Sequence, residues 1–361
     1  MPADGKARGA VVVGLSGGVD SAVAAALLRD QGYEVRALFL QLPVFGGSDN
    51  AAARDAAQRV SEHLGVPLEQ MDAREPFERN VLEEFADAYA QGRTPNPCVR
   101  CNDRVKFRLM IQHAEQVGAR RVATGHYARI VKPDGTERPM LARGRQGDDQ
   151  SYFLYALGQS VLSRALLPLG DMHKSDVRAL AADLHLPVSQ RPDSQDLCFL
   201  AGGHYREFLW DRRPDAFRPG PIVHVSGRVL GEHEGIACYT IGQRRGLGIA
   251  HSEPLYVVEL DPQKNTVVVG EREHVLRAEM TLRQVHWMAS RPQDGPLSAR
   301  VKIRYNHPGA PARVETTGRQ RVRVRFAEPQ EAPCPGQAAV FYRGDVVLGG
   351  GVIDQVAERN T

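Results

Sequence analysis

GLSGGVDS, residues 14–21, is the stretch that decides the fold. An apolar run at residues 10–13 precedes it and an alanine-rich run at residues 22–28 follows it, so its glycines lie at a turn from a strand to a helix. Gly17 and Gly18 allow the backbone to approach an anion, and the first N–H groups of the helix face the same place. The turn predicts a phosphate site; the alternative is an ordinary glycine-rich turn in an α/β domain.

Length and composition describe an ordinary protein of several domains. The chain has 361 residues, of which 42% are hydrophobic and 25% are charged, and two or three domains are expected. No signal sequence is visible in residues 1–9 and no apolar run reaches membrane length, so we expect a cytoplasmic protein with no membrane partner. Five cysteines are too few for a disulfide scaffold, and a reducing compartment leaves their thiols available for chemistry.

The first half of the sequence alternates between strand-like and helix-like segments. Apolar runs at residues 34–41 and 121–124 alternate with helical patterns such as residues 51–64. A later helix is expected at residues 171–184, with Asp171 as its cap. This alternation predicts an α/β fold with a doubly wound parallel sheet. Ligands collect at the carboxyl ends of the strands in such sheets, so three parts of the chain are expected to converge: residues 14–21, Leu40 and Gly125-His126.

After about residue 205 the sequence changes to short β-rich segments separated by glycine, proline and Asp-Pro turns. We therefore predict three domains. A nucleotide-binding catalytic domain is expected over residues 1–205, a small β-rich central domain over residues 206–274, and a C-terminal β-barrel over residues 275–361.

The C-terminal domain has a local excess of positive charge, although the net charge of the whole chain is only +3. Residues 296–326 hold one acidic residue, Glu315, and eight basic residues: Arg300, Lys302, Arg304, Arg313, Arg319, Arg321, Arg323 and Arg325. The last three arginines fall on one face of a strand, because side chains alternate between the two faces. The pattern predicts a surface for a polyanion, with a solvated charged face as the alternative.

Three of the five cysteines lie in motif-dense stretches. Cys98 and Cys101 belong to TPNPCVRCN, and Cys198 belongs to DSQDLCFL, whereas Cys238 and Cys334 are interpreted as packing or loop residues. A C-x-x-C pair by itself fits redox chemistry, metal binding or chance, and no second pair completes a zinc site, so no metal centre is predicted. Beside a phosphate-binding loop, the thiols favour sulfur transfer.

Several motifs in one order over nearly the whole chain resemble a single family. SGGVDS has no Lys-Ser or Lys-Thr pair after it and is similar to the PP-loop of ATP pyrophosphatases, which cleave ATP between its α and β phosphates. The further motifs are TPNPCVRCN with VKF, ATGHYAR, DQSYFL, DSQDLCFL, GEHEGIACYTIGQRRGLGI, KIRY, and PGQ with AVFY and GD. Together they resemble the bacterial tRNA-specific 2-thiouridylases (MnmA/TrmU family).

This resemblance implies an ATP-dependent sulfurtransferase that adenylates O2 of the wobble uridine of tRNA, position 34, and replaces it with persulfide sulfur. It implies that Cys198 carries the persulfide and that Cys101 is the nucleophile, which frees the terminal sulfur or closes a Cys101–Cys198 disulfide after transfer. Uracil O2 is a poor leaving group, so its adenylation is chemically reasonable. An external thiol would reopen the disulfide, and we expect Arg100 and Arg104 to favour the thiolates.

Cys98 departs from the pattern of the family, because many members have Asp at this position. An alternative therefore stays open, in which Cys98, Cys101 and Cys198 hold an iron–sulfur cluster with one open iron. Persulfide chemistry is the leading hypothesis.

The resemblance also implies which residues bind ATP with Mg²⁺ and which bind tRNA. The expected ATP contacts are Gly14, Leu15, Ser16, Gly17, Gly18, Val19, Asp20, Ser21, Leu40 and Gly125. The expected tRNA contacts are Asn96, Pro97, Cys98, His126, Asp148, Asp149, Gln150, Arg304, Tyr305 and Gln337. Asp20 either helps to hold Mg²⁺ or caps the helix that follows. The family usually has Lys at position 148, so Asp148 is a doubtful phosphate contact.

The partners that the resemblance implies are tRNAs for glutamate, glutamine and lysine, and a protein that donates persulfide sulfur. To expose O2, the wobble base must turn out of the anticodon loop. Two other functions fit only part of the sequence. A different adenylating PP-loop enzyme leaves Cys101 and Cys198 without a role, and an RNA-binding protein with a degenerate nucleotide domain conflicts with the intact loop.

Overall fold

A computed structural model describes residues 8–46, 50–133, 136–145, 147–192, 197–200, 203–288 and 295–356. Residues 1–7, which bear on the expected absence of a signal sequence, and residues 193–196 of the DSQDLCFL motif lie outside the described residues. The chain divides into two compact units. The first comprises the described residues of Met1–Asn80, Cys98–Gly202 and Asp345–Val347, and the second those of Val81–Pro97, Gly203–Gly344 and Leu348–Thr361.

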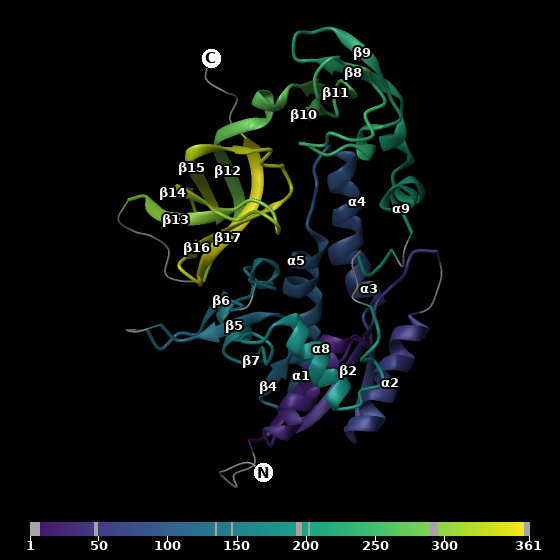
Figure 1. Ribbon diagram of the computed structural model, residues 1–361, viewed down its shortest axis with the longest axis vertical. Coiled ribbons are helices and arrows are strands. Elements are labelled where there is room, and N and C mark those ends of the chain that lie inside the picture. Colours follow the sequence, from purple (N-terminus) through teal and green to yellow (C-terminus); the bar gives the residue numbers. More distant parts are fainter. Residues whose placement is uncertain are drawn as a thin grey trace. The chain divides into compact units, whose positions relative to one another are not determined.

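The first unit is built on a parallel sheet with the strand order β3-β2-β1-β4-β7. Figure 1 labels β2, β4 and β7 of this sheet. Its strands are β1 (Ala10–Gly14), β2 (Glu34–Gln41), β3 (Leu68–Asp72), β4 (Arg121–Ala123) and β7 (Ala165–Leu166). Val13 of β1 pairs with Ala37 of β2 on one side and with Ala123 of β4 on the other. The carboxyl ends of these three strands therefore lie next to one another, as the sequence predicts.

Helices cover both faces of this sheet, which confirms the doubly wound α/β fold. The helices and helical turns of this part of the chain are α1 (Val19–Asp30), α2 (Ala51–Leu64), α3 (Arg74–Phe77), η1 (Glu78–Leu82), α5 (Pro97–Cys101), η2 (Asn102–Lys106), α6 (Phe107–Gln116), η3 (Ser151–Phe153), α7 (Gln159–Leu162) and α8 (Lys174–Asp183). The side chains of Val11 and Val13 pack with α1, α2 and α8, while α6 lies against β1 and β4 and places Met110 against Gly14.

Two local features of the first unit complete its description. A hairpin of β5 (Ala128–Val131) and β6 (Met140–Arg143) follows β4, and Ala142 pairs with Val346. Helix α8 begins at Lys174 with His173 as its N-cap, so the expectation that Asp171 caps this helix is wrong. The Asp171 carboxylate instead forms an ion pair with Arg145, with 2.7 Å between Oδ1 and Nε.

The second unit contains a small β-rich part. Its helices and helical turns are α4 (Glu83–Ala90), α9 (Tyr205–Arg212), η4 (Pro214–Phe217), η5 (Ile236–Cys238) and η6 (Arg272–Val275). Four strands form a sheet in the order β10-β11-β8-β9: β8 (Gly220–His224), β9 (Val229–His233), β10 (Tyr256–Asp261) and β11 (Thr266–Gly270). Ile222, Val257 and Val267 are buried in its core.

The second unit also contains the predicted C-terminal barrel. Its strands are β12 (Leu276–Trp287), β13 (Leu297–Lys302), β14 (Ala310–Gly318), β15 (Arg321–Glu331), β16 (Ala338–Arg343) and β17 (Val346–Val356). They are joined in the order β12-β15-β14-β13-β16-β17, and a further pairing of β12 with β17 closes the ring. Val322, Val324 and Phe326 of β15 point into the barrel core, so the alternation expected for this strand is confirmed.

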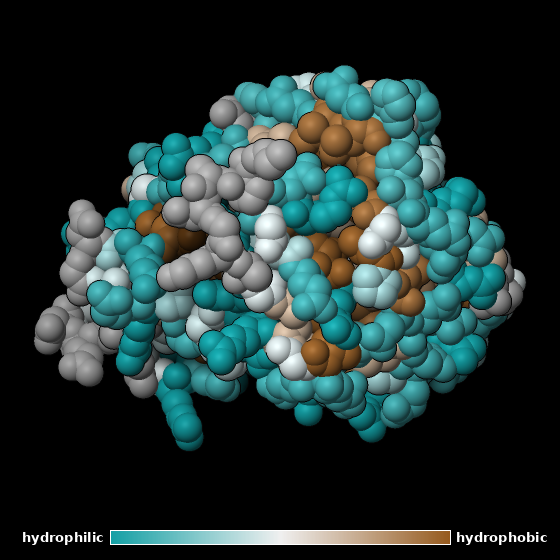
Figure 2. All heavy atoms as spheres, turned by 90° about the horizontal axis from the view of Figure 1, so that it is seen from below, coloured by the Kyte–Doolittle hydropathy of each residue, from teal (hydrophilic) through white to brown (hydrophobic). Residues whose placement is uncertain are grey.

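Among the described residues, no helix is long and apolar enough to cross a membrane. The face drawn in Figure 2 is mainly hydrophilic, with separate patches of apolar residues between the polar ones. Large apolar side chains that are exposed in the described part of the chain include Trp210 and Val229 of the second unit.

Candidate functional site

The glycine-rich loop joins β1 to α1 and is braced by two serine hydroxyls. The Ser21 hydroxyl donates to the Gly18 carbonyl at 3.0 Å and accepts the N–H of Ser16 at 3.1 Å. Gly18 is the N-cap of α1, and no side chain caps this helix. The first N–H groups of a helix have no partner within the helix, so the loop and the start of α1 present donors suited to a phosphate.

Two glycines are required here because other chain segments approach them closely. Gly17 has φ +77°, and a Cβ at this position would lie 2.2 Å from the carbonyl oxygen of Ala53. A Cβ on Gly125, which follows β4, would lie 2.6 Å from the carbonyl carbon of Asp20. The structure thus brings Gly125 against the start of α1, and Leu40 lies in the adjacent strand β2. A side chain larger than that of glycine at either position would collide with the neighbouring backbone beside the phosphate loop.

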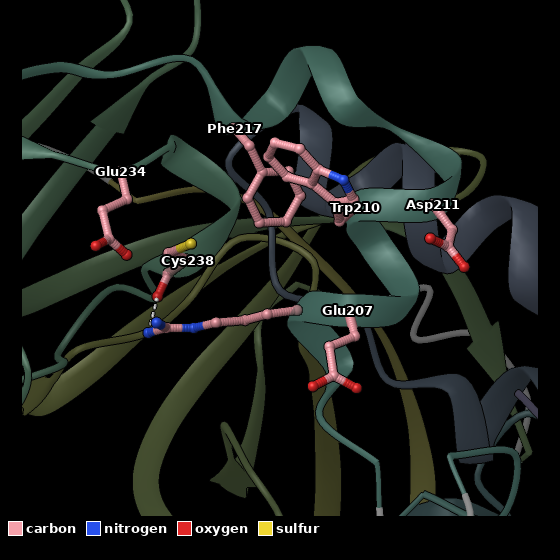
Figure 3. A pocket seen from close by; sticks show the side chains of 7 residues that line it. Glu207, Trp210, Asp211, Phe217, Glu234 and Cys238 are labelled. Carbon is pink, nitrogen blue, oxygen red and sulfur yellow. Dashed lines mark hydrogen bonds between the residues drawn. The ribbon is translucent and has the colours of Figure 1, made fainter. Parts of the chain in front are cut away.

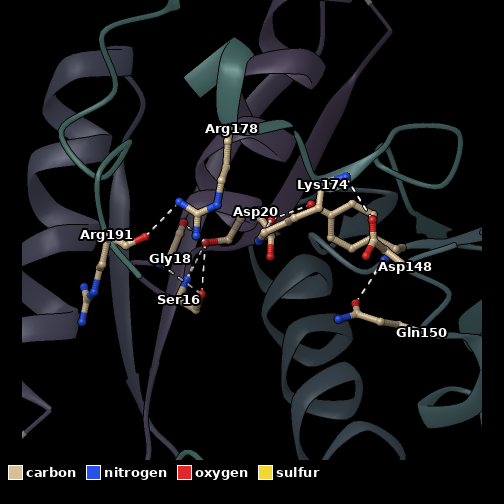
Figure 4. Close-up of polar contacts among 10 residues, drawn as sticks. Ser16, Gly18, Asp20, Asp148, Gln150, Lys174, Arg178 and Arg191 are labelled. Atoms are coloured by element: carbon tan, nitrogen blue, oxygen red, sulfur yellow. Dashed lines mark hydrogen bonds and ion pairs between the residues drawn. The ribbon is translucent and has the colours of Figure 1, made fainter. Parts of the chain in front are cut away.

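Basic side chains from distant parts of the sequence lie beside the loop (Figure 4). The Arg191 guanidinium donates to the Gly17 carbonyl at 2.9 Å. Lys174, the first residue of α8, donates from Nζ to Oδ1 of Asp20 at 2.6 Å, and the same oxygen accepts the Tyr127 hydroxyl at 2.7 Å. Asp20 is therefore held by an ion pair and does not cap α1, so that alternative is wrong. Sequence reasoning missed Lys174 and Arg191, since only the fold brings them to the loop.

Three expected RNA contacts make hydrogen bonds within the first unit. Asp148 Oδ2 accepts the backbone N–H of Lys174 at 3.0 Å and so caps the start of α8. Asp149 Oδ1 accepts the N–H of Ser151 at 2.9 Å, and Gln150 Oε1 accepts the N–H of Tyr127 at 3.1 Å. These residues shape the loop beside α8, and their contact with RNA stays a prediction.

Cys98 and Cys101 lie in a helical stretch of unusual form. Helix α5 ends at Cys101, the π-helical segment η2 follows directly, and α6 begins at Phe107. π-helical segments are rare and frequently lie at functional sites. The backbone of Lys106, at the end of η2, acts on Cys101 and lowers the pKa of its thiol, in opposition to burial. The wide π-helical turn thus places Lys106 near Cys101, the second cysteine of the C-x-x-C pair.

The structure brings Cys98, Cys101 and Cys198 together. Burial raises the pKa of the Cys198 thiol to about 12, and the neighbouring Cys101 and Cys98 raise it further. Burial likewise raises the pKa of the Cys98 and Cys101 thiols. Part of Cys98 and of Cys198 is open to solvent. Protein atoms nevertheless surround both sulfurs, and this crowding governs their ionisation. All three thiols are protonated at neutral pH.

Lys106 is a cation that acts on all three thiols. Its charge lowers the pKa of Cys98, Cys101 and Cys198, in opposition to burial. The Arg104 guanidinium, by contrast, is paired with Asp103 at 2.8 Å and is not among the groups that lower these pKa values. The expectation that an arginine favours the thiolates is therefore wrong for Arg104, whereas for Arg100 it stays a prediction. Lys106 belongs to the VKF motif, but sequence alone does not predict the π-helical turn that brings it near the thiols.

His126 lies in the same electrostatic environment. Burial, and then the charge of Lys106, hold the pKa of His126 well below its ordinary value, so the imidazole is neutral at neutral pH. Its Nδ1 lies 2.8 Å from the Thr124 hydroxyl, and its ring stacks on Phe107. A neutral imidazole can exchange hydrogen bonds with RNA but does not neutralise a phosphate charge.

The raised pKa values predict how the thiols react. A raised pKa leaves less thiolate at a given pH, so iodoacetamide should modify Cys198 slowly at neutral pH and faster as the pH rises through the alkaline range. Lys106→Met removes the charge that lowers these pKa values and should slow the modification of Cys101 at neutral pH by about three- to tenfold. Peptide mass spectrometry at several pH values measures both rates. Equal rates for Cys198 in the folded and the urea-unfolded chain would contradict the prediction.

The expected RNA contacts of the second unit lie in several segments. Asn96 and Pro97 precede Cys98, Pro97 is buried, and Gln337 lies just before β16. Arg304 is exposed and donates from Nη1 to the Glu331 carbonyl at 2.9 Å. The ring of Tyr305 has the Lys302 ammonium 5.6 Å from its centre.

The charge of strand β15 is largely compensated by neighbouring strands. Arg325 and Arg323 form ion pairs with Glu279 of β12, with closest N–O distances of 2.7 and 3.2 Å. Arg321 lies 3.5 Å from Asp354 of β17. The count of eight basic residues against one acid therefore overstates the positive field of this face, because the compensating carboxylates lie outside residues 296–326.

A pocket in the second unit holds none of these candidate residues. Its volume is about 530 Å³, and Figure 3 shows Trp210 and Phe217 on one wall. Three carboxylates line it, those of Glu207, Asp211 and Glu234, whereas one cation, Arg206, donates to the Cys238 carbonyl at 3.1 Å. The excess of negative charge makes this pocket unsuitable for a nucleotide.

Comparison with known proteins adds to this geometry. Three family models match: tRNA methyl transferase HUP domain over residues 9–202, tRNA methyl transferase PRC-barrel domain over residues 206–271, and Aminomethyltransferase beta-barrel domain over residues 277–353. The chain is 48% identical over 348 residues to the tRNA-specific 2-thiouridylase MnmA of Syntrophotalea carbinolica, covering 95% of this chain and 98% of that one.

Other relatives have the same name and similar coverage. The protein of Trichormus variabilis is 47% identical over 348 residues, covering 96% of this chain and 98% of that one. The protein of Geobacter metallireducens is 45% identical over 360 residues, covering 97% of this chain and 98% of that one. Such identity over nearly the full length of both chains shows that this protein belongs to the tRNA-specific 2-thiouridylase family.

Proposed function

We propose that the protein is an ATP-dependent sulfurtransferase that adenylates O2 of uridine 34 of tRNA and replaces it with persulfide sulfur. The observation that carries the proposal is the presence, in one unit, of a phosphate-binding loop and three thiols that affect one another's ionisation. The loop and the thiols serve activation by ATP and transfer of sulfur. These two features agree with the thiouridylase name of the relatives and not with the methyl transfer that the names of the family models mention.

The loop and its neighbours suit the activation step. ATP with Mg²⁺ would bind at residues 14–21, Leu40 and Gly125, where the close approach at Gly17 and Gly125 leaves the backbone donors uncovered. Attack of uridine O2 on the α phosphate forms the O2–P bond, and pyrophosphate leaves with the electrons of the broken P–O bond. Lys174 lies near the loop and can compensate the charge that develops on the leaving pyrophosphate. Asp20 is the carboxylate of the loop that can face Mg²⁺.

The thiols suit the transfer step. Cys198 would receive a terminal sulfur from a protein donor and become a persulfide. The Cys101 thiolate then attacks the inner sulfur of Cys198, the Cys101–Cys198 disulfide forms, and the terminal sulfur leaves as hydrosulfide. Hydrosulfide adds to C2 of the base, and AMP departs with O2. Two equivalents of an external thiol return the disulfide to two thiols. Lys106 stabilises the thiolates in this sequence, since its charge acts on both sulfurs.

We infer the substrate and the compartment from the family. The expected substrates are the tRNAs for glutamate, glutamine and lysine, whose wobble uridine would turn outward to reach the thiols. Five free cysteines, none of them in a disulfide, fit the reducing cytoplasm that the sequence predicts.

A reconstituted reaction tests the function. The protein is incubated with ATP, Mg²⁺, a persulfide donor and unmodified tRNA, and the digested nucleosides are analysed by mass spectrometry. We expect 2-thiouridine only when all components are present. Release of AMP without thiolated tRNA would indicate a different adenylating enzyme, and binding of tRNA without consumption of ATP would indicate an RNA-binding protein.

The iron–sulfur alternative is a second candidate, because the structure brings Cys98 into the group of thiols. Three cysteine thiolates and one open iron would hold a sulfide for transfer, and the same three residues would be its ligands. Anaerobic purification with iron and sulfide analysis decides between the two. A colourless, iron-free and fully active enzyme excludes the cluster, whereas activity proportional to bound iron excludes the persulfide route.

Arg304 should contribute to tRNA binding. Its partner is a neutral carbonyl, so its charge remains available to a phosphate. Arg304→Ala should weaken tRNA binding by about tenfold and flatten its salt dependence, without changing persulfide loading of Cys198. The matched control is Arg325→Ala, which should change affinity little because Glu279 already compensates that charge. Affinity measured against salt concentration tests this, and equal losses in both variants would count against the role of Arg304.

A further inference from the structure

The small β-rich part of the second unit contains a group of side chains that the proposed function does not use. His224, His251 and Glu271 each offer one ligand atom, and these atoms all lie within 4.8 Å of one another. In the described part of the chain, no other group of three His, Cys, Asp or Glu side chains has its ligand atoms this close together. Two imidazoles and a carboxylate form a donor set that zinc and other divalent transition metals prefer.

The contacts within the group suit a metal ion. Nε2 of His224 lies 3.2 Å from Oε1 and 3.3 Å from Oε2 of Glu271. Ligand atoms on a tetrahedral zinc ion, with bonds of about 2.0–2.2 Å, are separated by similar distances. The His251 ring stacks on the His224 ring, with 5.8 Å between their centres. His251 must approach the other two ligands to complete three bonds to one ion.

Neighbouring groups hold two of the ligands in place. The backbone N–H of Ser226 donates to Nδ1 of His224 at 3.2 Å, and the Ser226 hydroxyl lies 2.8 Å from the same nitrogen. Nε2 therefore carries the ring proton and faces Glu271 in the metal-free protein. A metal ion at Nε2 would move this proton to Nδ1, where the Ser226 hydroxyl can accept a hydrogen bond from it. Oε2 of Glu271 lies at an ion-pair distance of 3.2 Å from Nδ1 of His274, without the geometry of a hydrogen bond. Partners of this kind orient the ligands in metal sites.

The fold positions the ligands on two kinds of element. His224 ends β8 and Glu271 directly follows β11, and these strands are paired in parallel, with Val269 opposite His224. His251 is exposed and lies in the connection between η5 and β10. Two ligands are thus fixed by the sheet, while the third belongs to a loop.

We propose that His224, His251 and Glu271 bind one divalent transition metal ion, of the Zn²⁺ class, with a fourth position open to water. The ion joins the loop to the sheet. The same loop carries Arg244 and Arg245, both exposed, so metal binding restricts the segment that presents these two cations. This site is independent of the ATP loop and of the three reactive thiols.

The test uses the full chain with Cys98, Cys101 and Cys198 all replaced by serine, since thiols also bind these metals. Titration with Co²⁺, followed by its visible absorption, should show one equivalent bound in a nitrogen and oxygen environment, and Zn²⁺ should displace it. In this background His251→Ala should weaken binding by at least about 100-fold, and Ser226→Ala by roughly tenfold, as the loss of an outer partner does. Glu253→Gln, beside His251 in the loop, and His185→Ala, an exposed histidine of the first unit, should bind Co²⁺ as the parent does.

Limited proteolysis gives a second readout. Zn²⁺ should slow cleavage by trypsin after Arg244 and Arg245 in the parent and in Glu253→Gln, but not in His251→Ala. His251 is exposed, so this variant should keep the fold, and circular dichroism checks that it does. Equal Co²⁺ affinity in the parent and in His251→Ala, or cleavage that is independent of Zn²⁺ in the parent, overturns the proposal and leaves the group as a hydrogen-bonded ionic cluster.

Discussion

Cys198→Ser is expected to abolish the formation of 2-thiouridine, by roughly 1,000-fold or more, as the loss of an essential nucleophile does. Serine cannot carry a persulfide, whereas the phosphate loop does not depend on this side chain. The variant should therefore still transfer AMP from ATP to tRNA. Release of AMP and pyrophosphate, measured beside thiolated nucleoside in the same reaction, separates the two steps.

The control for this prediction is Cys238→Ala. Cys238 is buried in the core of the β-rich part of the second unit, and its side chain has no place in the proposed chemistry. This variant should form 2-thiouridine normally. In Cys101→Ser, mass spectrometry should find an additional sulfur retained on Cys198, since the nucleophile that releases it is absent. Loss of AMP transfer in Cys198→Ser would show that this cysteine has a different role.

Gly17→Ala should eliminate the ATP-dependent step itself, by about 100-fold or more in AMP transfer, because misplaced positioning groups cost rates of this order. The added Cβ would lie 2.2 Å from the Ala53 carbonyl oxygen, so the loop or the start of α2 must move. The change also places a non-glycine residue at φ +77°, which costs roughly 1–2 kcal/mol. Movement of the loop would further break the hydrogen bond from Arg191 to the Gly17 carbonyl.

Gly65→Ala is the matched control, because it separates the two costs. Gly65 ends α2, the helix whose first turn faces Gly17, and it also has a positive φ, of +65°. A Cβ at Gly65 has no atom within 4 Å. This variant should lose about 1 kcal/mol of stability but keep AMP transfer. Thermal unfolding and AMP release measure both effects, and equal activity of the two variants would mean that the close approach at Gly17 does not shape the ATP site.

The sequence was informative wherever neighbouring residues determine the structure. The apolar run before GLSGGVDS and the alanine-rich run after it were sufficient to predict the β1–loop–α1 turn, and the helical pattern at residues 51–64 coincides with α2. The alternation of arginine with apolar residues in β15 predicted its buried face. In each case the periodicity or the turn residue itself carries the structural information.

Features that depend on contacts between distant segments were missed. Lys174 and Arg191 reach the loop from more than 150 positions away along the chain, with sequence separations of 154 and 174 residues. Glu279 and Asp354 neutralise arginines of β15 from other strands, so a local count of charge could not anticipate them. Strand β12 does not show a continuous alternation of apolar and polar residues either. Its register shifts next to Gln284, which has a φ of +52°, and the alternation of the strand is interrupted there.

The π-helical segment η2 has a consequence for insertions and deletions in this part of the chain. A turn of this kind accommodates one residue more than a regular α-helical turn, and each residue rotates the following side chains by about 100°. Phe107, Met110 and Ala114 are buried on one face of α6, while Cys101 lies before the widened turn. Removing a single residue from η2 would restore a regular α-helical turn but would rotate the segments before and after it relative to each other by about 100°. Either the apolar face of α6 would then leave the interior, or the C-x-x-C pair would turn away from Cys198.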